Sequence, residues 1–418
     1  MVVIPSSVRD TVKHTQEGVM TTKVKKAGAL AALLAALAAF AVLAVGSATA
    51  AGHPIVIGWA FDSKGAMAPF DNPALAAAQV RVKQWNAKGG VKGRQLKIVT
   101  CDTQGNKPAI AKSCAAKLIG QNADVIFTTC DVDFAAPVVQ EAINAGKLTV
   151  APCIGTDQMG PKRFGPKGAL AFSFGNVAQD EGSAMAQYAY AKGWRTAALA
   201  TDTVIVYFKD VVKAFKARFT QLGGKIVAQE SYQSLGSTSQ QNLITRLNGK
   251  KADVIVTATA GSFGALPQIV AGLRTLSNET PILNSWAGDG TYWVTKDPQV
   301  TNYYYVTYAS AFGDDPNPAV NALAKKLGKA TFGIGGFVTG AAAVDGLVTA
   351  INRAGGSTTG AALAAQMVKF KKVPTLSGLV SFSPLLHSVF GRQYRVIKIQ
   401  DNKPKVVGTV VAKVVPKI

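Results

Sequence analysis

The 418-residue chain is poor in acidic residues, in histidine and in cysteine. It has 23 Asp and Glu residues against 45 Lys and Arg, three histidines and four cysteines, and its formal net charge is +22. Few histidines, and no two cysteines in a CxxC pair, exclude the ligand spacing of a structural zinc site. The lysines are mostly scattered singly, without a basic stripe that alternates with aromatics. We therefore interpret the charge as a solvated surface and expect no nucleic-acid partner.

Sequence signatures of common enzymes are absent as well. The chain has neither a GxSxG nucleophile elbow nor a GxxxxGKS/T phosphate-binding loop. The glycine-rich segment from Gly333 to Phe337 lacks the third glycine of a dinucleotide fingerprint, and we interpret it as a break before the next helix. We therefore predict a protein that is not an enzyme and that carries no cofactor or metal.

Only one long apolar run is present, close to the N-terminus. Lysines follow Met20, an Ala/Leu-rich stretch covers residues 27–45, and the small-residue sequence SATA ends at Ala50. This order is typical of a secretory signal. We predict a signal peptide in residues 1–50 with a polar N-terminal extension, cleavage near Ala50, and a periplasmic or secreted mature protein. A membrane anchor stays open, because about 19 apolar residues just span a bilayer, and Met1 and Met20 both stay open as the start.

Beyond residue 53, short β-branched segments alternate with helical stretches. We expect the first helix to begin at Pro73, because Asn72 and Pro73 supply an N-cap and a proline at the first helical position. The alternation predicts an α/β fold with a parallel sheet covered by helices on both faces. The expected strands are 54–58, 96–100, 124–128 and 148–151, separated by helices at 73–87, 107–121 and 134–146.

The second half of the chain repeats this plan. NADVIFTT, residues 122–129, is echoed by KADVIVTA, residues 251–258, and in both copies a helix, two glycines and a strand come before. A repeat of this length is too long for a solenoid. The sequence therefore predicts two similar lobes, each a parallel sheet flanked by helices.

Polar residues gather where the strands of the first lobe end. The helix before the second strand ends at Gly89–Gly90, and that strand then places Cys101 and Asp102 at its carboxyl end. The segments 129–134 and 151–156 follow the next two strands in the same way. In open α/β sheets this edge is where ligands bind, so we expect a binding site there.

Four cysteines lie in the first lobe, and in an oxidising compartment an even number favours disulfides. Four cysteines allow three pairings. Cys130 and Cys153 follow neighbouring strands, and Cys114 lies early in the helix after Cys101. The topology therefore favours the pairs Cys101–Cys114 and Cys130–Cys153.

Several stretches resemble one known family. They are WNAKGGVKGRQL (85–96), the strand ending in Cys101-Asp102, ADVI from Ala123, AGKLTVAP (145–152) and YFKD (207–210). The chain from 54 to 400 thereby resembles the exported solute-binding proteins of branched-chain amino-acid-type ABC transporters. The resemblance implies the type I periplasmic-binding fold, in which two lobes joined by a three-segment hinge close on a small-molecule solute. It also implies ABC transporter permease subunits as partners, and we expect a monomer.

The resemblance further implies the lobe boundaries and the loops that hold the solute. We expect lobe 1 at 53–173 plus 310–386 and lobe 2 at 174–309 plus 387–418. The ligand-binding residues expected at matching positions are Phe61, Ser63, Asp131, Val132, Asp133, Thr156, Tyr207, Trp286 and Asp289. The last of them matches the acid that pairs an α-ammonium group in the family.

Asp131 and Asp133 depart from the family pattern. Amino-acid binders have a Ser/Thr-rich run here that grips the α-carboxylate, whereas two carboxylates in a partly desolvated cleft repel one. We therefore expect a solute with hydrogen-bond donors or positive charge, with Tyr207 and Trp286 supplying stacking or cation–π contacts. Two alternatives stay open. Either aspartate could cap the following helix, and Asp133 is favoured over Asp131 for this role. Both aromatics could belong to the lobe core.

These features together predict an exported solute-binding protein that captures a small polar solute, an amino acid, an amide or a related amine, by hinge closure. A sensory protein of the same fold would share all of them and stays open. An exported hydrolase with Asp131 and Asp133 as its acid–base pair is the third, less favoured hypothesis.

Overall fold

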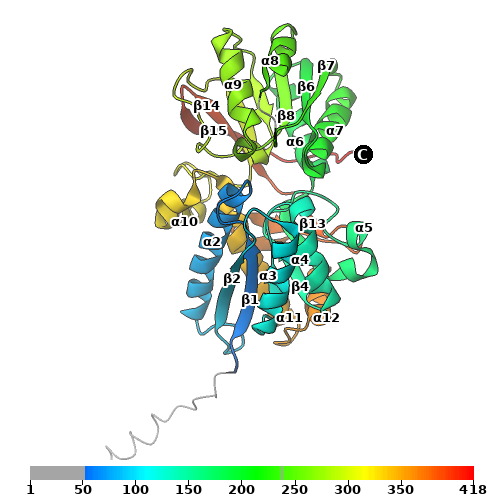
Figure 1. Cartoon of the computed structure of the whole chain (residues 1–418), viewed down its shortest axis with the longest axis vertical. Coiled ribbons are helices and arrows are strands. Elements are labelled where there is room, and N and C mark those ends of the chain that lie inside the picture. The colour runs from blue at the N-terminus through cyan, green and yellow to red at the C-terminus, as the bar shows by residue number, and fades with distance from the viewer. Residues whose placement is uncertain (1–51, 237–238) are drawn as a thin grey trace, which may run out of the picture. The chain divides into compact units, whose positions relative to one another are not determined.

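The computed structural model describes residues 52–236 and 239–418 of the chain. The predicted signal peptide in residues 1–50 lies outside the described residues. From Gly52 onward the described elements form two large sheets, each with helices on both faces (Figure 1), and a small two-stranded sheet of β11 (Val373–Thr375) and β12 (Gly378–Val380). The predicted α/β class with two similar halves is confirmed.

The first sheet is wholly parallel, with strand order β13-β5-β4-β3-β1-β2. Its central strands β3 and β4 are short apolar runs, VIF and LTVA, buried at every position. Continuous burial is what a parallel sheet covered on both faces requires. The strands are β1 (Ile55–Phe61), β2 (Leu96–Asp102), β3 (Val125–Phe127), β4 (Leu148–Ala151), β5 (Ala171–Asn176) and β13 (Ser388–Val389).

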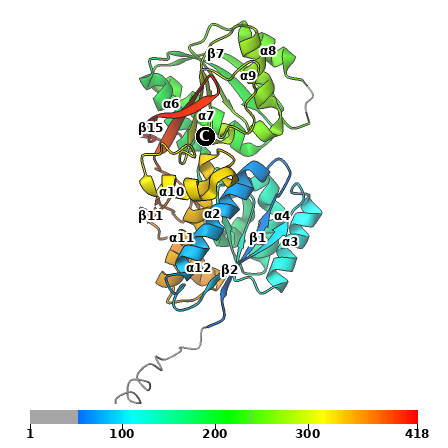
Figure 2. The same ribbon diagram turned by 90° about the vertical axis from the view of Figure 1, so that its left-hand side faces the viewer.

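Two groups of helices cover this sheet. Helices α3 (Pro108–Gly120) and α4 (Val132–Asn144) pack together on one face. Helices α2 (Ala68–Asn86) and α11 (Val338–Arg353) pack together on the other, with α12 (Gly360–Met367) beside α11 (Figure 2). The chain therefore returns from far along its sequence to complete the first half.

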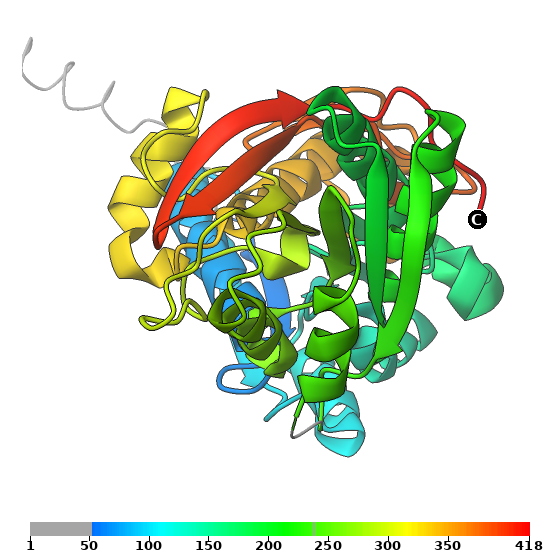
Figure 3. The ribbon, with the colours of Figure 1, turned by 90° about the horizontal axis from the view of Figure 1, so that it is seen from above.

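The second sheet has the order β15-β14-β10-β9-β8-β6-β7 and ends in an antiparallel hairpin (Figure 3). Helices α6 (Ala178–Ala191) and α7 (Val206–Gln221) pack against each other, as do α8 (Gln241–Asn248) and α9 (Ala265–Thr275). The strands are β6 (Thr196–Asp202), β7 (Lys225–Tyr232), β8 (Val254–Ala258), β9 (Ile282–Asn284), β10 (Tyr303–Thr307), β14 (Tyr394–Gln400) and β15 (Lys403–Val410).

The internal repeat predicted from the sequence is confirmed by strand order. The order β2-β1-β3-β4-β5 in the first sheet has the same connectivity as β7-β6-β8-β9-β10 in the second. The two echoed segments form β3 and β8, which occupy equivalent places. Each half is therefore the same doubly wound unit.

The chain passes between the sheets three times. The passages lie between β5 and α6, between β10 and the helix α10 (Pro318–Leu327), and between β13 and β14. The predicted boundary at 174 falls inside β5, and β13 still belongs to the first sheet although it follows residue 387. The passages thus lie within a few residues of the expected positions, and the division into lobes with those exact boundaries stays a prediction.

Both predicted disulfides are present, and no described cysteine is free. Cys101 and Cys114 lie with their Cα atoms 5.5 Å apart, and Cys130 and Cys153 with theirs 4.7 Å apart. The second pair joins the ends of β3 and β4, which are neighbours in the sheet. Within the described residues no single helix is long and apolar enough to cross a membrane. One bent pair of helices has the length and composition for it when taken together, Pro318–Thr331 with Gly335–Arg353.

Helices α2 and α11 approach so closely that one position allows only glycine. A Cβ atom on Gly340 would lie 1.8 Å from the carbonyl oxygen of Ala74. Such a contact with backbone cannot be relieved by rotating a side chain, so the helices would have to separate.

We predict that Gly340→Ala lowers the free energy of unfolding by about 1–3 kcal/mol, the usual cost of overpacking. Gly120→Ala is the matched control, because nothing lies within 4 Å of its Cβ position at the end of α3. It should leave stability unchanged or raise it by up to about 1 kcal/mol. Urea unfolding of the three proteins measures both effects, and equal midpoints would contradict the tight crossing.

Candidate ligand-binding cleft

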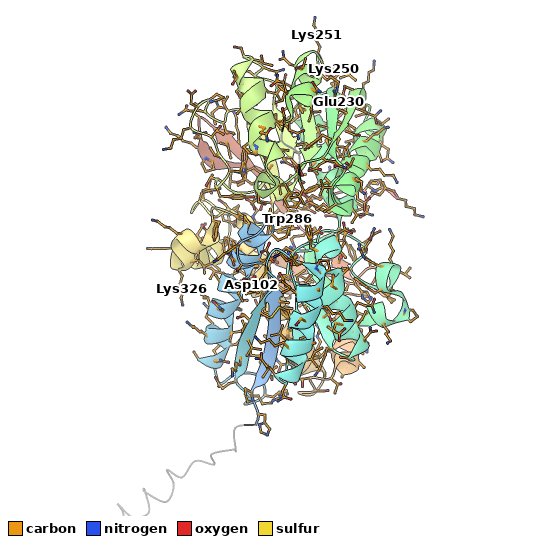
Figure 4. The ribbon with its side chains drawn as sticks, in the orientation of Figure 1. Asp102, Glu230, Lys250, Lys251, Trp286 and Lys326 are labelled. Atoms are coloured by element: carbon orange, nitrogen blue, oxygen red, sulfur yellow. A yellow bond between two sulfur atoms is a disulfide. The ribbon has the colours of Figure 1, made fainter. Side chains whose placement is uncertain are left out.

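The carboxyl-end rims of the two sheets face each other and enclose a small cavity. Trp286 lies where the two halves meet, and Asp102, the last residue of β2, lies at the rim of the first sheet (Figure 4). The volume of the cavity that the centre of a water molecule can reach is about 20 Å³. Its wall consists of Met67, Phe70, Cys130, Asp131, Ile205, Tyr207, Phe208, Ala260, Phe263, Trp286 and Ala287.

Five aromatic rings form a continuous band in this wall. The ring centroids of Phe70 and Trp286 lie 5.1 Å apart, and those of Trp286 and Tyr207 lie 6.3 Å apart. From Tyr207 the band continues to Phe208 at 5.8 Å and to Phe263 at a further 5.6 Å. Phe70 belongs to the first half and the other four to the second, so the contact of Phe70 with Trp286 exists only while the rims are together.

Asp131 is the single charged residue of the wall. It is only 4% exposed, and it is the N-cap of α4, because its Oδ1 accepts hydrogen bonds from the backbone N–H groups of Asp133 (2.9 Å) and Phe134 (3.3 Å). Its other oxygen, Oδ2, accepts no hydrogen bond from any described residue. Burial first, and the nearby Asp133 second, raise the pKa of Asp131 to about 7.

This geometry resolves the alternative that the sequence left open. The helix cap is Asp131, not Asp133, which the sequence favoured for that duty. Asp133 instead makes two other bonds. Its Oδ1 is 2.7 Å from Nη1 of Arg163 in the same half. Across the cleft, its Oδ2 accepts a 3.0 Å hydrogen bond from the backbone N–H of Val206.

The bond to Val206 caps a helix of the opposite half. Val206 is the first residue of α7, and the N-cap residue of that helix, Ile205, provides no side-chain cap. The carboxylate of Asp133 therefore meets the positive end of the α7 dipole from across the cleft. A second direct contact joins Ser262 Oγ to the carbonyl oxygen of Ala66 at 2.6 Å.

Glu181 is a site residue that the sequence analysis missed. It is fully buried in the first turn of α6, and its Oε1 accepts hydrogen bonds from the Tyr207 hydroxyl (2.9 Å) and the Trp286 backbone N–H (2.7 Å). Its Oε2 is buried without a partner among the described residues. Burial raises the pKa of Glu181 to about 8. Glu181 lies behind the aromatic wall and fixes the position of two of its members.

Two further buried acids shape the loop that carries Met67 and Phe70. The Asp62 carboxylate accepts a hydrogen bond from the Met67 backbone N–H (3.1 Å). The Asp71 carboxylate accepts bonds from the backbone N–H groups of Asp62 (2.8 Å) and Cys130 (3.0 Å). These bonds join the loop after β1 to the loop after β3. The helix begins at Ala68, five residues before the expected Pro73, and this extra turn brings Phe70 into the cavity.

Of the predicted ligand residues, Asp131, Tyr207 and Trp286 line the cavity together, and their role in binding stays a prediction. The remaining ones lie outside its wall. Val132 is buried in the core beneath α4, and the ring of Phe61 packs against the main core.

Ser63, Thr156 and Asp289 also make structural contacts outside the wall. Ser63 Oγ donates to Asp102 at 2.5 Å, and the Thr156 carbonyl accepts a bond from Ser388 Oγ. Asp289 accepts bonds from Thr307 Oγ1 (2.5 Å) and from the backbone N–H of Gly336 (3.1 Å), next to the passage into α11. The acid that the family pattern assigns to an α-ammonium group thus supports the hinge region in this chain.

The wall of the cavity is mostly apolar. It has one carboxyl group, five rings and no lysine or arginine. No group of three or more metal-ligating side chains is present among the described residues.

Facing sheet rims that enclose an aromatic cavity define the class of protein: a two-lobed binding protein with its ligand site between the lobes. The model of the periplasmic binding protein family matches residues 54–404. The chain belongs to this family, and the resemblance to its branched-chain amino-acid-type members is confirmed.

Curated relatives match most of the chain at low identity. The Leu/Ile/Val-binding protein BraC3 of Rhizobium johnstonii is 24% identical over 336 residues, which cover 78% of this chain and 87% of that protein. The Leu/Ile/Val-binding protein homolog 3 of Brucella melitensis is 24% identical over 345 residues, or 81% of this chain and 90% of that protein.

Solved structures share the fold. The substrate-binding protein LivJ of Streptococcus pneumoniae, in complex with isoleucine, gives a TM-score of 0.73 at 22% identity and covers 86% of this chain and 99% of its own. A solute-binding protein of an ABC transporter from R. palustris, in complex with 4-hydroxybenzoate, gives 0.73 at 18% identity, with coverage of 86% and 98%. At these identities the likeness establishes the fold, and the bound molecules are properties of those proteins.

We predict that Asp133→Ala shifts the empty protein toward an open form, because it removes the cap that the first half places on α7. A lost N-cap costs about 1 kcal/mol, enough to change the populations of two states of similar energy. The radius of gyration from small-angle X-ray scattering should increase.

Asp133→Asn is the matched control, since asparagine caps helices as well as aspartate does, and it should give a smaller change. An unchanged radius of gyration in the alanine variant would show that the cross-cleft bond does not hold the rims together.

Buried acids also make stability depend on pH. The pKa values of Asp71, Asp131 and Asp289 rise from 3.8 to about 7, and that of Glu181 from 4.5 to about 8, in each case mainly through burial. Between pH 4 and 8 the folded protein therefore holds protons that the unfolded chain has lost. The free energy of unfolding must fall as pH rises through this window.

We predict that Glu181→Gln makes this fall shallower and raises stability relative to the unchanged protein at pH 8. Glutamine keeps the Oε1 acceptor for Tyr207 and Trp286 but cannot ionise. Urea unfolding at pH 5, 6.5 and 8 measures the slope. The control Glu141→Gln, in a surface ion pair 3.8 Å from Lys112, should keep the original slope, and equal slopes in both variants would contradict the assignment.

Proposed function

We propose that this chain is the extracytoplasmic solute-binding component of an ABC importer, which captures a small solute between its lobes and delivers it to membrane permease subunits. The observation that carries the proposal is the cavity wall, which is assembled from loops of both halves at the ends of equivalent strands. Membership in the periplasmic binding protein family supports the same role. The signal-like segment in residues 1–50 supports export.

Capture by closure follows from how the wall is divided. Phe70 and Asp131 belong to one half, whereas Tyr207, Phe263 and Trp286 belong to the other. A solute bound to one rim gains the second set of contacts only when the rims meet. Its differential affinity for the closed form is therefore what shifts the population toward closure. Closed lobes then present a surface that a permease can distinguish from the open one.

The solute class that the wall favours is a small molecule that donates hydrogen bonds or carries positive charge, such as an amide or an amine. The only carboxyl group of the wall is that of Asp131, and its free oxygen can accept but not donate a hydrogen bond when it is ionised. We further propose that the protein is a monomer. We also propose that it is not an enzyme, since the wall holds no nucleophile paired with a base.

We predict that the purified protein releases a bound small molecule on denaturation, identifiable by mass spectrometry, or is stabilised by members of a library of amines, amides and amino acids. A ligand that binds only the folded form raises the melting temperature. Trp286→Ala should weaken binding of any such ligand by about tenfold or more, because it opens the aromatic band.

Trp194→Ala is the matched control, because Trp194 packs against Tyr188 and Tyr304 away from the cavity. It should leave affinity unchanged even where it lowers stability. If no molecule is released and no ligand stabilises the protein, the binding role is contradicted. Chemical turnover of a bound solute would identify an enzyme instead.

A further inference from the structure

We propose that the solute is a compact organic ammonium ion without a carboxylate group, held with its charge against Asp131 Oδ2 and enclosed by the five aromatic rings. A methylated or short-chain alkylammonium has this chemistry. The inference deepens the proposed function and rests on it. It names a solute class that differs from the amino acids and aromatic acids bound to the related structures.

The first argument is that the anion site of the cleft is already filled. The N-terminus of a helix binds carboxylates through its free N–H groups. At the start of α4 the N–H groups of Asp133 and Phe134 bond instead to the carboxylate of Asp131, from within the chain. A carboxylate on the solute would find these donors occupied and would face a like charge.

The second argument concerns the missing cation. No lysine or arginine lines the cavity. Arg163 is the positive group whose field reaches Asp131, and it is ion-paired with Asp133 at 2.7 Å. A solute carboxylate would therefore be buried without a partner, which is unfavourable because its lost hydration is not replaced.

The third argument is the aromatic band. Rings carry negative charge on their faces, and cages of several rings are the usual protein surface for alkylated ammonium ions. Phe70, Tyr207, Phe208, Phe263 and Trp286 all line one cavity, and neighbouring centroids in the band are separated by 5.1–6.3 Å. An ammonium ion in this space would lie among several rings and beside one carboxylate group.

The fourth argument is size. A single water needs about 10–15 Å³ of space measured this way, and the closed cavity offers about 20 Å³. Only a solute of a few heavy atoms can bind with the lobes near this closure. A long side chain or a sugar would require the rims to stay well apart, which would break the bonds of Asp133 and Ser262 across the cleft.

Binding of a cation should also displace a proton. Burial and the nearby Asp133 raise the pKa of Asp131 to about 7, although Arg163 and the backbone N–H groups of Phe134 and Asp133 act in the opposite direction. Across the cleft Tyr207 faces the same cavity, with Glu181 behind it, and Asp71 bonds to the neighbouring Cys130. An ammonium ion takes the place of the proton, so affinity should rise with pH from 5 to 7 and then level off.

The test uses isothermal titration calorimetry of the purified protein with paired probes. Methylammonium chloride is compared with glycine, which adds only a carboxylate, and tetramethylammonium chloride with trimethylglycine for the same reason. Tert-butanol serves as the neutral probe of similar shape. We expect an ammonium probe to bind at least about tenfold more tightly than its carboxylated partner and than tert-butanol, as loss of one charge-assisted contact predicts.

The decisive variant is Asp131→Asn. Asparagine keeps the cap of α4 and removes the charge, so the melting temperature should change little while ammonium affinity falls by about tenfold or more. The rise of affinity between pH 5 and 7 should disappear in this variant and persist in Glu181→Gln. Persistence of the rise in Asp131→Asn would overturn the assignment of the proton to Asp131.

Failure of this inference is distinguishable from failure of the proposed function. Tighter binding of glycine, trimethylglycine or another carboxylated solute would overturn the ammonium assignment and leave the binding role intact. So would release of a neutral or anionic molecule from the purified protein with no binding of either ammonium probe. If no probe, no released molecule and no member of the library of amines, amides and amino acids binds, both proposals fall.

Discussion

The bond between the Asp131 carboxylate and the first turn of α4 is the interaction on which the character of the cleft depends. In this fold the carboxyl ends of parallel strands bring helix N-termini to the rim, and such termini attract anions. Asp131 satisfies that attraction from within the chain. The rim therefore keeps its helix geometry, and the N–H groups of Asp133 and Phe134 are already bonded within the chain.

Several buried acids around the cleft follow the same logic. Asp62 and Asp71 bond to backbone N–H groups and join the loops after β1 and β3. Glu181 fixes Tyr207 and Trp286, and Asp289 bonds to Gly336 near a passage between the halves. Burial raises the pKa values of Asp71, Glu181 and Asp289, and carboxyl groups with strongly raised pKa values concentrate at functional sites. Here the buried acids arrange the loops around a cavity whose wall is mostly apolar.

Closure connects these parts. The contacts between the rims include a carboxylate of the first half on the end of α7, one serine hydroxyl on a carbonyl oxygen, the Gln179 amide on Asp157, and ring contacts such as that of Phe70 with Trp286. A solute that adds contacts to both rims shifts the balance between open and closed forms.

The sequence by itself determined the repeated α/β plan, the strand ends at the rim and both disulfides, because these follow from local periodicity and from strands adjacent in the chain. It also placed Asp131, Tyr207 and Trp286 at the rim. It missed Phe70, because Asn72 and Pro73 gave a start signal for α2 although the helix begins at Ala68. It missed Glu181, an acid in a helix of small residues with no motif around it. Asp131 caps α4 through bonds to the next turn of its own helix, whereas Asp133 bonds across the cleft and the rings share one wall only because the two halves meet. The cross-cleft bonds join residues 73 and 196 positions apart, and no local pattern encodes them.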